Sequence, residues 1–538
     1  MTNPQSPLGN QPAAIDARSP QLIRYCIFIA CAGLYLLPFM RVLLSSGIEG
    51  SVDYAAVRIV HGQVFARDFF EVMGPGTPYW LAAFFKLFGV TFMAARICLF
   101  VTSLGSGILI FYLSSRVCES HKLLPCLLVA STIFSPAWPG NSHHIDSNFF
   151  ALLSVAFMVL WQGERWNILL IAAGAFAGLT TFFLQPKGIL LFVAMLVWLW
   201  MQRRKRIESL SSIGLVAGGY LGASGIILAY FWSQGALSSL VYSNIVWPSR
   251  NYGAVNTVPY AQGVISWYWN RYMMLKSAFS WPFSLAVIPV SAILIVPLLF
   301  IAALPVLMPI SALLSAHAGW KNLRTLPPEI VLYLLCGFAL WFSEFHRRDI
   351  VHLMFGSPLL IILCVYFLDA IRNKYSENVL QILAITSVWL AAFNLLGAVA
   401  AHSQSTRAGS VAVYKNDPVL AFIDTHVRAG EEIFVYPYHP MYYFLSSTIN
   451  PTRYSLLIYG YNTDSEFYDA ISSLELSRPR YVLWETGFGA NNTSSMPALA
   501  SARTTGLIKE PYLESHYGFL MEENGYRIMM RKGVEAAY

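Results

Sequence analysis

Long apolar runs, separated by short polar segments, fill the first three quarters of the chain. A helix of about 20 apolar residues crosses the hydrocarbon core of a bilayer, so the pattern predicts about 11 transmembrane helices. These spans lie near Leu22–Leu44, Phe92–Val117, Leu123–Ala137, Asp146–Gln162, Trp166–Leu184, Gly188–Met201, Ile213–Trp232, Trp281–Leu313, Ile330–Phe342, Val351–Ile371 and Val379–Ala401. The Trp281–Leu313 run is long for one span and short for two, so both readings stay open.

Basic residues indicate which loops face the cytoplasm, because cytoplasmic loops carry an excess of Lys and Arg. With the N-terminus inside, these loops hold Arg116, Lys122, Arg165, Arg203, Arg204, Lys205, Arg206, Lys321, Arg324, Arg372 and Lys374. Residues 1–20 are polar and predict a disordered cytoplasmic tail. Residues 21–402 form the predicted membrane domain, with external loops over 47–79, 234–280 and 343–352. An odd number of spans places the C-terminal region outside.

The pattern changes after the last apolar run, where shorter segments predict a small α/β domain over residues 413–538. Three segments rich in β-branched and aromatic residues predict strands, at Glu432–Pro437, Tyr481–Glu485 and Tyr526–Arg531. Two amphipathic segments, each starting with an Asp suited to an N-cap, predict helices at Asp417–Arg428 and Asp464–Leu474. The predicted fold class is a mainly α polytopic membrane protein with a small α/β domain on its outer side.

The composition agrees with a membrane protein. Of the 538 residues, 56% are hydrophobic and 12% are charged, whereas a soluble domain carries about 25% charged residues. This excludes an ordinary soluble enzyme. The net charge of +7 is uneven, because 11 basic and 14 acidic residues from Ser403 onward give −3 and leave +10 for the membrane part. Since the positive charge belongs to membrane loops, we expect no nucleic acid partner.

The first external loop holds the carboxylate that points most directly to chemistry. From Asp53 onward, apolar residues recur at helical spacing as far as Gly62, which predicts an amphipathic helix lying in the membrane interface. A half-desolvated carboxylate costs stability unless it is paired or functional, and partial burial raises its basicity. The residues alone leave two readings of Asp53: it caps the helix, or it takes a proton from a hydroxyl group.

The same loop carries a longer motif. Its spacing is Asp53-Tyr54-(x)3-Arg58-(x)3-Gly62-(x)5-Asp68-Phe69-Phe70-Glu71-(x)3-Pro75-(x)3-Tyr79-Trp80, followed by Leu87-Phe88-Gly89 and Ala95-Arg96. This stretch resembles the first external loop of the GT-C glycosyltransferases, in the branch that contains protein O-mannosyltransferases and lipid A aminoarabinose transferases. Those enzymes take a sugar from a polyprenyl phosphate carrier at the outer membrane face. The resemblance implies that Asp53 is the catalytic residue.

The resemblance extends less tightly to other external positions. Asp146 resembles a second external Asp of the family, and Lys187 resembles the lysine of its Lys-Gly motif. Arg348 and His352 resemble residues of its Arg- and His-containing loop before a late span. Together with the charged residues of the first loop, these matches imply donor-phosphate or acceptor contacts at Arg58, Asp68, Glu71, Asp146, Lys187, Arg348 and His352.

Two departures from the family pattern concern the first loop. The family often has Glu after the catalytic Asp, where this chain has Tyr54, and commonly has a Lys at the position of Val72-Met73-Gly74. Because that Lys helps to hold the carrier phosphate in some members, other cations must replace it here. The 234–280 loop has no acidic residue and offers the cations Arg250, Arg271 and Lys276. Its aromatic side chains suit sugar stacking, although interfacial anchoring is the simpler explanation for each of them.

No metal site is predicted. His143 and His144 lie beside Asp146, but adjacent side chains of an extended segment point in opposite directions and no third ligand has diagnostic spacing. A requirement for a divalent metal ion stays open.

The leading hypothesis is an inverting glycosyltransferase of the bacterial inner membrane. It would move a sugar from a polyprenyl-phosphate carrier to an envelope glycan, lipid or protein, with the outer domain shaping acceptor access. A transporter or flippase of a lipid-linked saccharide is the alternative. A transporter calls for polar residues inside several spans and for broken helices in paired positions, whereas the acidic residues here gather in external loops. An inactive scaffold in envelope assembly is a third possibility.

Overall fold

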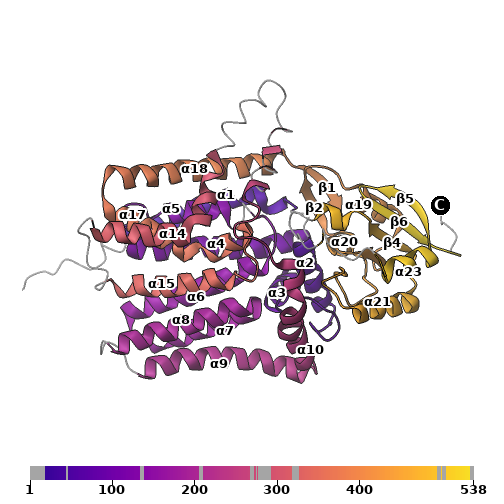
Figure 1. Ribbon diagram of the computed structural model, residues 1–538, viewed down its shortest axis with the longest axis horizontal. Helices are drawn as coiled ribbons and strands as arrows, with labels where there is room; N and C mark the ends of the chain where they lie inside the picture. The colour runs from indigo at the N-terminus through magenta and orange to yellow at the C-terminus, as the bar shows by residue number, and fades with distance from the viewer. Residues whose placement is uncertain are drawn as a thin grey trace, which may run out of the picture.

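The computed structural model describes residues 19–43, 47–133, 138–204, 210–266, 293–317, 326–492 and 505–533, together with Trp269, Tyr272, Met273, Lys276 and Leu499. Figure 1 shows a long bundle of helices that carries a smaller region with a β-sheet at one end, where the C-terminus lies. The chain is mostly helical, as the apolar pattern predicts.

The bundle is built from α1 and α4 to α9, followed by α14 to α18. Their bounds are α1 (Ser19–Leu36), α4 (Phe92–Val117), α5 (Leu124–Thr132), α6 (His143–Glu164), α7 (Asn167–Phe183), α8 (Gln185–Arg204), α9 (Leu210–Ser233), α14 (Val296–His317), α15 (Pro328–Ser343), α16 (Ile350–Gly356), α17 (Pro358–Ile371) and α18 (Lys374–Ala400). A short 3₁₀ helix, η1 (Leu37–Arg41), extends α1.

Seven helices of the described chain are long and apolar enough to cross a membrane, and α16 and α17 add an eighth span if the pair counts as one. That pair bends by 71°, so the predicted span over Val351–Ile371 is broken between Gly356 and Pro358, and whether it crosses as one span stays a prediction. The apolar helices α7 and α15 are shorter, and α5 has nine residues. The total number of spans therefore stays a prediction, and the first part of the Trp281–Leu313 run lies outside the described residues.

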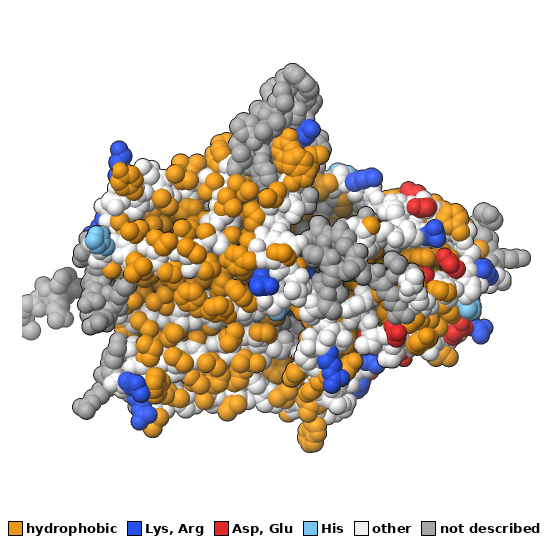
Figure 2. All heavy atoms as spheres, viewed as in Figure 1, with side chains coloured by type: hydrophobic (Ala, Val, Ile, Leu, Met, Phe, Trp, Pro, Cys, Tyr) orange, Lys and Arg blue, Asp and Glu red, His pale blue; other side chains and the backbone are white. Residues whose placement is uncertain are grey.

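The bundle packs tightly inside and shows apolar side chains outside. Gly174 on α7 faces the carbonyl oxygen of Val216 on α9, where a Cβ atom would lie only 2.0 Å from that oxygen, so only glycine allows this approach. Large apolar residues on the outer side of α9 are exposed, among them Leu221, Ile226 and Trp232. Figure 2 shows apolar side chains across this face of the bundle, while the Asp and Glu side chains in view lie over the sheet region. The protein is a multi-pass membrane protein.

The sheet region follows α18. A hairpin of β1 (His402–Thr406) and β2 (Gly409–Val413) precedes a four-stranded sheet with the order β3-β4-β6-β5. Strands β3 and β4 run parallel, and the other pairs run antiparallel. The remaining bounds are β3 (Ile433–Tyr436), β4 (Tyr481–Glu485), β5 (Tyr517–Glu523), β6 (Tyr526–Arg531), α19 (Pro418–His426), α20 (Met441–Ser446), α21 (Asp464–Ser477), α22 (Phe488–Asn491) and α23 (Lys509–His516).

Most predicted elements of this region form. The side chain of Asp417 caps α19 as predicted, but Thr463 rather than Asp464 caps α21, where Glu466 completes a capping box. The strands β1, β2 and β5 were not predicted. The residues of β1 are polar and those of β5 are largely exposed, while β2 is short and only Val411 and Val413 on it are buried.

The first external loop forms α2 (Gly47–Val60) and α3 (Gly76–Phe88), and Gly62 has the positive φ of 89° that follows the end of α2. The 234–280 loop begins with α10 (Leu237–Val241), η2 (Tyr242–Val246), η3 (Pro248–Tyr252) and α11 (Gly253–Asn256). Figure 1 places α2 between the bundle and the sheet region.

Helix α2 is buried rather than amphipathic. Its residues from Glu49 to Ala56 are all buried, because α3 covers one side and α20 of the sheet region covers another. A Cβ atom on Gly50 would lie 2.4 Å from the backbone nitrogen of Met441, so the backbones of α2 and α20 lie in close contact. The prediction of an amphipathic helix lying in the membrane interface is wrong, because the apolar pattern of α2 reflects its packing against the sheet region.

Candidate active site

Asp53 lies inside α2 and is fully buried. Its Oδ1 accepts a hydrogen bond from Asn141 Nδ2 at 3.0 Å, and within the described chain its Oδ2 has no hydrogen-bond partner. The reading of Asp53 as a helix cap is therefore wrong. A carboxylate oxygen left without a donor in a buried place is ready to accept a proton from a bound group.

A second buried carboxylate lies one turn before Asp53. Glu49 forms an ion pair with Arg96 at the start of α4, and the Arg96 Nε and Nη2 atoms also donate to the Val42 carbonyl at 3.1 and 2.7 Å. Burial raises the pKa of Asp53 well above its usual range, and the negative charge of Glu49 raises it further. Arg96 and Asn141 offset only part of this rise. Asp53 is thus a strong base for a carboxylate.

Asp146 is the second external Asp of the sequence analysis, and the structure brings it close to Asp53. It is buried in the first turn of α6, and both carboxylates lie within electrostatic range of the Cys98 thiol on α4. The two acids thus approach the same part of α4 from different elements.

Lys187 is fully buried and paired. Its Nζ lies 2.6 Å from Glu344 Oε1 and donates to Asn148 Oδ1 at 2.9 Å. His144 Nδ1 lies 3.0 Å from the other oxygen of Glu344. Burial on its own raises the pKa of Glu344, but Lys187 and His144 outweigh it and hold the pKa well below its usual range. The Lys187 ammonium is thus neutralised by protein groups in this conformation.

The 343–352 loop continues this network. Arg347 Nε lies 2.5 Å from Asp349 Oδ2, and His352 Nδ1 lies 2.7 Å from Asp349 Oδ1. Burial opposes ionisation of Asp349, yet His352 and Arg347 hold its pKa well below the usual range. The His352 ring also packs edge-on against His144, with centroids 4.7 Å apart. The side chain of Arg348 is exposed, so the arginine that joins this network is its neighbour Arg347, and the role expected of Arg348 stays a prediction.

Arg58 joins the first loop to the sheet region. Its Nη1 donates to the Thr452 carbonyl at 3.2 Å, and its Nε donates to Gln63 Oε1 at 2.5 Å. Tyr54, which stands where the family often has Glu, accepts a hydrogen bond from the backbone nitrogen of Asn450 at 2.8 Å. These contacts give Arg58 and Tyr54 structural roles in holding α2 against the sheet region.

The other two acids of the first loop differ from each other. Asp68 accepts a hydrogen bond from the backbone nitrogen of Val64 at 2.7 Å and pairs with Arg67 at 2.8 Å, so its side chain serves the local turn. Glu71 is fully buried, and burial raises its pKa to about 8, with Ser455 and Arg58 offsetting part of the effect. Glu71 therefore belongs with Asp53 as a buried acid that lacks a full counter-charge.

The cations proposed to replace the family lysine lie elsewhere. Arg250 and Lys276 are exposed, and Arg271 lies outside the described residues. Arg250 is near Tyr242 rather than near Asp53. The structure thus does not place Arg250 among the buried acids, and the role expected of Arg271 and Lys276 stays a prediction.

The histidines of α6 differ from their sequence description. They lie in the first turn of a helix, and the rings of His143 and His144 are 4.0 Å apart between centroids, so they do not point in opposite directions. Over the described ranges, no three His, Cys, Asp or Glu side chains converge as metal ligands do.

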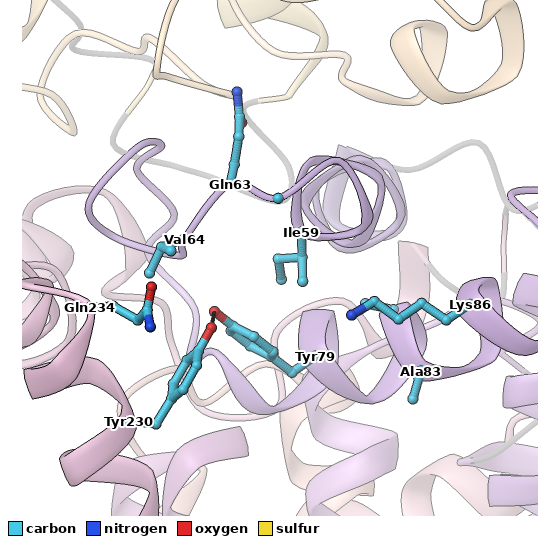
Figure 3. Close-up of a pocket in the computed structure, with 10 residues that line it drawn as sticks. Ile59, Gln63, Val64, Tyr79, Ala83, Lys86, Tyr230 and Gln234 are labelled. Carbon is cyan, nitrogen blue, oxygen red and sulfur yellow. Dashed lines mark hydrogen bonds between the residues drawn. The ribbon is translucent and has the colours of Figure 1, made fainter.

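A cavity of about 300 Å³ opens beside the first loop, between the end of α2, α3 and the end of α9. Figure 3 shows the hydroxyl groups of Tyr79 and Tyr230 facing each other across it, 3.1 Å apart, with Lys86 at one side. Asp53 and Glu71 do not line this cavity. It is separate from the buried acids.

The fold resembles that of known enzymes. The archaeal oligosaccharyltransferase AglB from Archaeoglobus fulgidus, solved in complex with an inhibitory peptide and a dolichol-phosphate, aligns with a TM-score of 0.52 at 12% sequence identity. The alignment covers 93% of this chain and 73% of AglB. The chain has the GT-C fold.

A further solved structure, ArnT from Cupriavidus metallidurans in the apo state, aligns with a TM-score of 0.42 at 11% identity over 95% of this chain and 98% of ArnT. No protein-family model matches the sequence, and no curated protein sequence matches it significantly. At 12% identity the likeness to AglB shows the fold alone and leaves substrates to be argued from the site.

Several residues of the site escaped the sequence analysis. Glu49 lies on the same face of α2 as Asp53, but the predicted helix began at Asp53 and so excluded it. Glu344 directly follows an apolar segment, a position that marks a paired or functional charge. Asn141 carries no signal in the sequence, because a polar residue in a loop is ordinary.

Proposed function

We propose that this protein is a glycosyltransferase that moves a sugar from a polyprenyl-phosphate carrier to an acceptor of the cell envelope. The observation that carries the proposal is Asp53. It is a buried carboxylate with one oxygen fixed by Asn141 and the other without a donor among the described residues. The GT-C fold supports the proposal by analogy, because AglB is an oligosaccharyltransferase with the same fold.

In the proposed reaction, Asp53 Oδ2 removes the proton of an acceptor hydroxyl group as its oxygen attacks the anomeric carbon of the sugar. The new glycosidic bond forms as the bond between that carbon and the carrier phosphate breaks, and the phosphate leaves with the electron pair. A single displacement inverts the anomeric configuration. Burial and the charge of Glu49 raise the pKa of Asp53, which increases its affinity for the proton of the acceptor hydroxyl group.

The leaving phosphate needs positive charge, and the chain offers two sources. Lys187 and Arg347 are buried beside the 343–352 loop but hold acidic partners. We propose that the carrier phosphate either displaces Glu344 from Lys187 or binds cations of the 234–280 loop, for which Arg250, Arg271 and Lys276 are candidates. Asp146 and His352 are proposed to border the acceptor side.

The transporter alternative has one structural point in its favour, the bend between α16 and α17. A transporter built from repeats is expected to break helices in paired positions. Across the part of the chain that the structure describes, this is the single bent pair that passes as a span. Among the described residues, the buried pair of Glu344 and Lys187 also lies at helix ends, with Glu344 directly after α15 and Lys187 in the first turn of α8.

We further propose that the sheet region faces the outside of a bacterial inner membrane, with the N-terminus in the cytoplasm. The acid-rich sheet region and the basic helix ends support this orientation. Orientation can be measured by labelling single cysteines placed in the sheet region of cysteine-free protein with a membrane-impermeant reagent.

The experiment that tests the function compares cells that lack the protein, cells that make it, and cells that make the Asp53→Asn variant. Mass spectrometry of envelope glycans and lipid-linked sugars is the readout. We expect a polyprenyl-phosphate sugar to accumulate, and one glycosidic linkage to disappear, both without the protein and with the variant. If the linkage persists in both cases while a lipid-linked saccharide is no longer exported, the protein is a transporter.

A further inference from the structure

Two carboxylates and one guanidinium group share a buried space at the start of α2. Glu49 and Asp53 are four residues apart on one helix, so both side chains lie on the same face. Glu49, Asp53 and Arg96 are each at most 1% exposed. With all three ionised, this group carries a net negative charge, and only one of the two acids can be the main partner of the cation.

The structure shows that Glu49 takes this cation. Arg96 Nη1 donates to Glu49 Oε1, and the two other nitrogens that bond in this group donate to the Val42 carbonyl. The guanidinium carbon also lies 4.1 Å from the centre of the Phe92 ring. Arg96 is thus fixed on three sides by groups other than Asp53. Among the described residues, Asp53 has the neutral Asn141 amide as its one hydrogen-bond donor.

We propose that Glu49 is a positioning residue, whose task is to hold the Arg96 guanidinium away from Asp53 so that Asp53 stays a carboxylate without a cation partner. A base that is paired with arginine gives up its proton affinity, whereas a base beside a second acid keeps it. The arrangement explains why the chain keeps two acids and one arginine in a dry place, which costs folding stability. The effect of Glu49 on catalysis rests on the proposed function, in which Asp53 is the base.

The groups that face Asp53 come from several elements. Glu49 lies on the same helix, Arg96 on α4, and Asn141 in the segment before α6. Asp146 on α6 and Cys98 on α4 are close by. Replacing Glu49 with Gln removes one negative charge and frees Arg96 to turn toward Asp53. Both changes favour the ionised form of Asp53, so they act in the same direction.

The test follows the protonation of Asp53 directly and needs no substrate. Infrared spectra of the full-length protein, made with isotope-labelled aspartate, are recorded across a pH range, and the carbonyl band lost in Asp53→Asn identifies Asp53. In the parent protein we expect this band to persist well above the pH at which ordinary aspartates ionise. In Glu49→Gln we expect its midpoint to fall by about one pH unit or more, because a nearby opposite charge shifts an Asp by about that amount.

Two further variants separate the proposal from a general disturbance of packing. In Glu49→Gln/Arg96→Gln the cation is also absent, so the midpoint should rise from the Glu49→Gln value toward the parent value without exceeding it. Glu71→Gln, which neutralises another buried acid of the same loop, should leave the Asp53 midpoint unchanged. An unchanged midpoint in folded Glu49→Gln overturns the proposal.

If Glu49→Gln does not fold, Glu49→Asp decides instead. Its shorter side chain weakens the contact with Arg96 but keeps the charge, so a smaller downward shift is expected and no shift overturns the proposal. Failure of the proposed role of Glu49 can be told apart from failure of the proposed function. A variant Asp53→Asn that still transfers sugar refutes the role of Asp53 as a base, whatever the titration shows.

Discussion

Two buried charge clusters lie where the bundle meets the sheet region, and they are balanced in opposite ways. The cluster of the first external loop has three buried acids, Glu49, Asp53 and Glu71, and Arg96 and Arg58 leave this cluster short of positive charge. The cluster around the 343–352 loop pairs each acid with a cation, Glu344 with Lys187 and Asp349 with Arg347.

The difference separates chemistry from architecture. A matched buried pair holds two elements together and resists change in either partner. An acid without a counter-charge destabilises the fold and persists where its proton affinity is useful. We therefore propose that the first cluster carries the base, and that the second positions the 343–352 loop in the conformation described here.

The largest expected effect is on the matched cluster. Replacing Lys187 with Met leaves Glu344 buried without its main cation, which should lower the free energy of unfolding by about 3–5 kcal/mol. Thermal unfolding of the purified protein in detergent measures this. The double variant Lys187→Met/Glu344→Gln should recover most of the loss, because both charges are then absent. Equal losses in the single and double variants would contradict the pairing.

In the cluster of the first external loop, neutralising an acid should raise the free energy of unfolding instead of lowering it. Glu71 has a pKa of about 8 in the folded protein against 4.5 in its ordinary state, so its ionisation costs stability progressively as the pH rises between these values. Below the ordinary value the full stability is present. Glu71→Gln should therefore raise the free energy of unfolding by up to about 5 kcal/mol above about pH 8, since the pKa rises by about 3.5 units and each unit is worth about 1.4 kcal/mol.

The control for this prediction is the pH itself. Near pH 4 the parent protein and Glu71→Gln should unfold at similar temperatures, because the parent acid is protonated in both states. A gain that is the same at all pH values would show that Glu71 acts through packing and not through its charge.

Neighbouring arginines offer a matched pair of substitutions. Arg347 bonds to Asp349 at 2.5 Å and to Asn256 Oδ1 at 2.6 Å, whereas Arg348 is exposed. Arg347→Ala should cost about 1–3 kcal/mol, because it leaves buried acceptors unsatisfied. Arg348→Ala should change stability by less than about 0.5 kcal/mol. Similar unfolding temperatures for the two variants would refute the assignment of Arg347 to the cluster.

The smallest effect is expected at Asp68. Its pair with Arg67 is partly exposed, so Asp68→Asn should cost about 0.2–1 kcal/mol. The hydrogen bond with Arg67 lowers the pKa of Asp68 despite some burial, so this contribution is present above the ordinary pKa and fades as the pH falls through the folded value. Chemical unfolding at pH 7 and at low pH measures the difference, and a transfer defect in this variant would return Asp68 to the catalytic group.

The sequence was sufficient for the elements that carry a regular pattern. Long apolar runs predicted the main helices of the bundle, and β4 and β6 form over the predicted residues. The bend at Gly356 was missed because the run from Val351 to Ile371 is apolar on both sides of it. The burial of α2 was missed because its cover, α20, lies almost 400 residues later in the chain.

Sequence could predict a site residue that a motif surrounds. It could not predict the contacts of a residue whose partner lies far away in the chain. Asp53 could be found because a motif surrounds it, and the structure places it in the buried group described above. Lys187 and Arg58 were expected to bind ligands, but the contacts that engage them come from Glu344 and Thr452 in distant segments. Spacing along the chain does not report such long-range pairing.

The sheet region covers the helix that carries Asp53, in addition to its expected role in acceptor access. Because Met441 and Tyr438 contact α2, deleting the chain after about Ser410 would expose the helix that carries Asp53. Such a truncation tests stability rather than acceptor choice. Point changes on the surface of the sheet region are the better probe of acceptor recognition.

The most direct test of the central claim uses the lipid-linked sugar that accumulates in cells without the protein. Purified parent protein and Asp53→Asn are each given this compound as donor, together with envelope material from the same cells as acceptor. We predict transfer by the parent protein and a rate lower by about 10²–10⁴-fold for the folded variant, the usual contribution of a general base. Transfer by Asp53→Asn at a rate close to that of the parent would contradict the account.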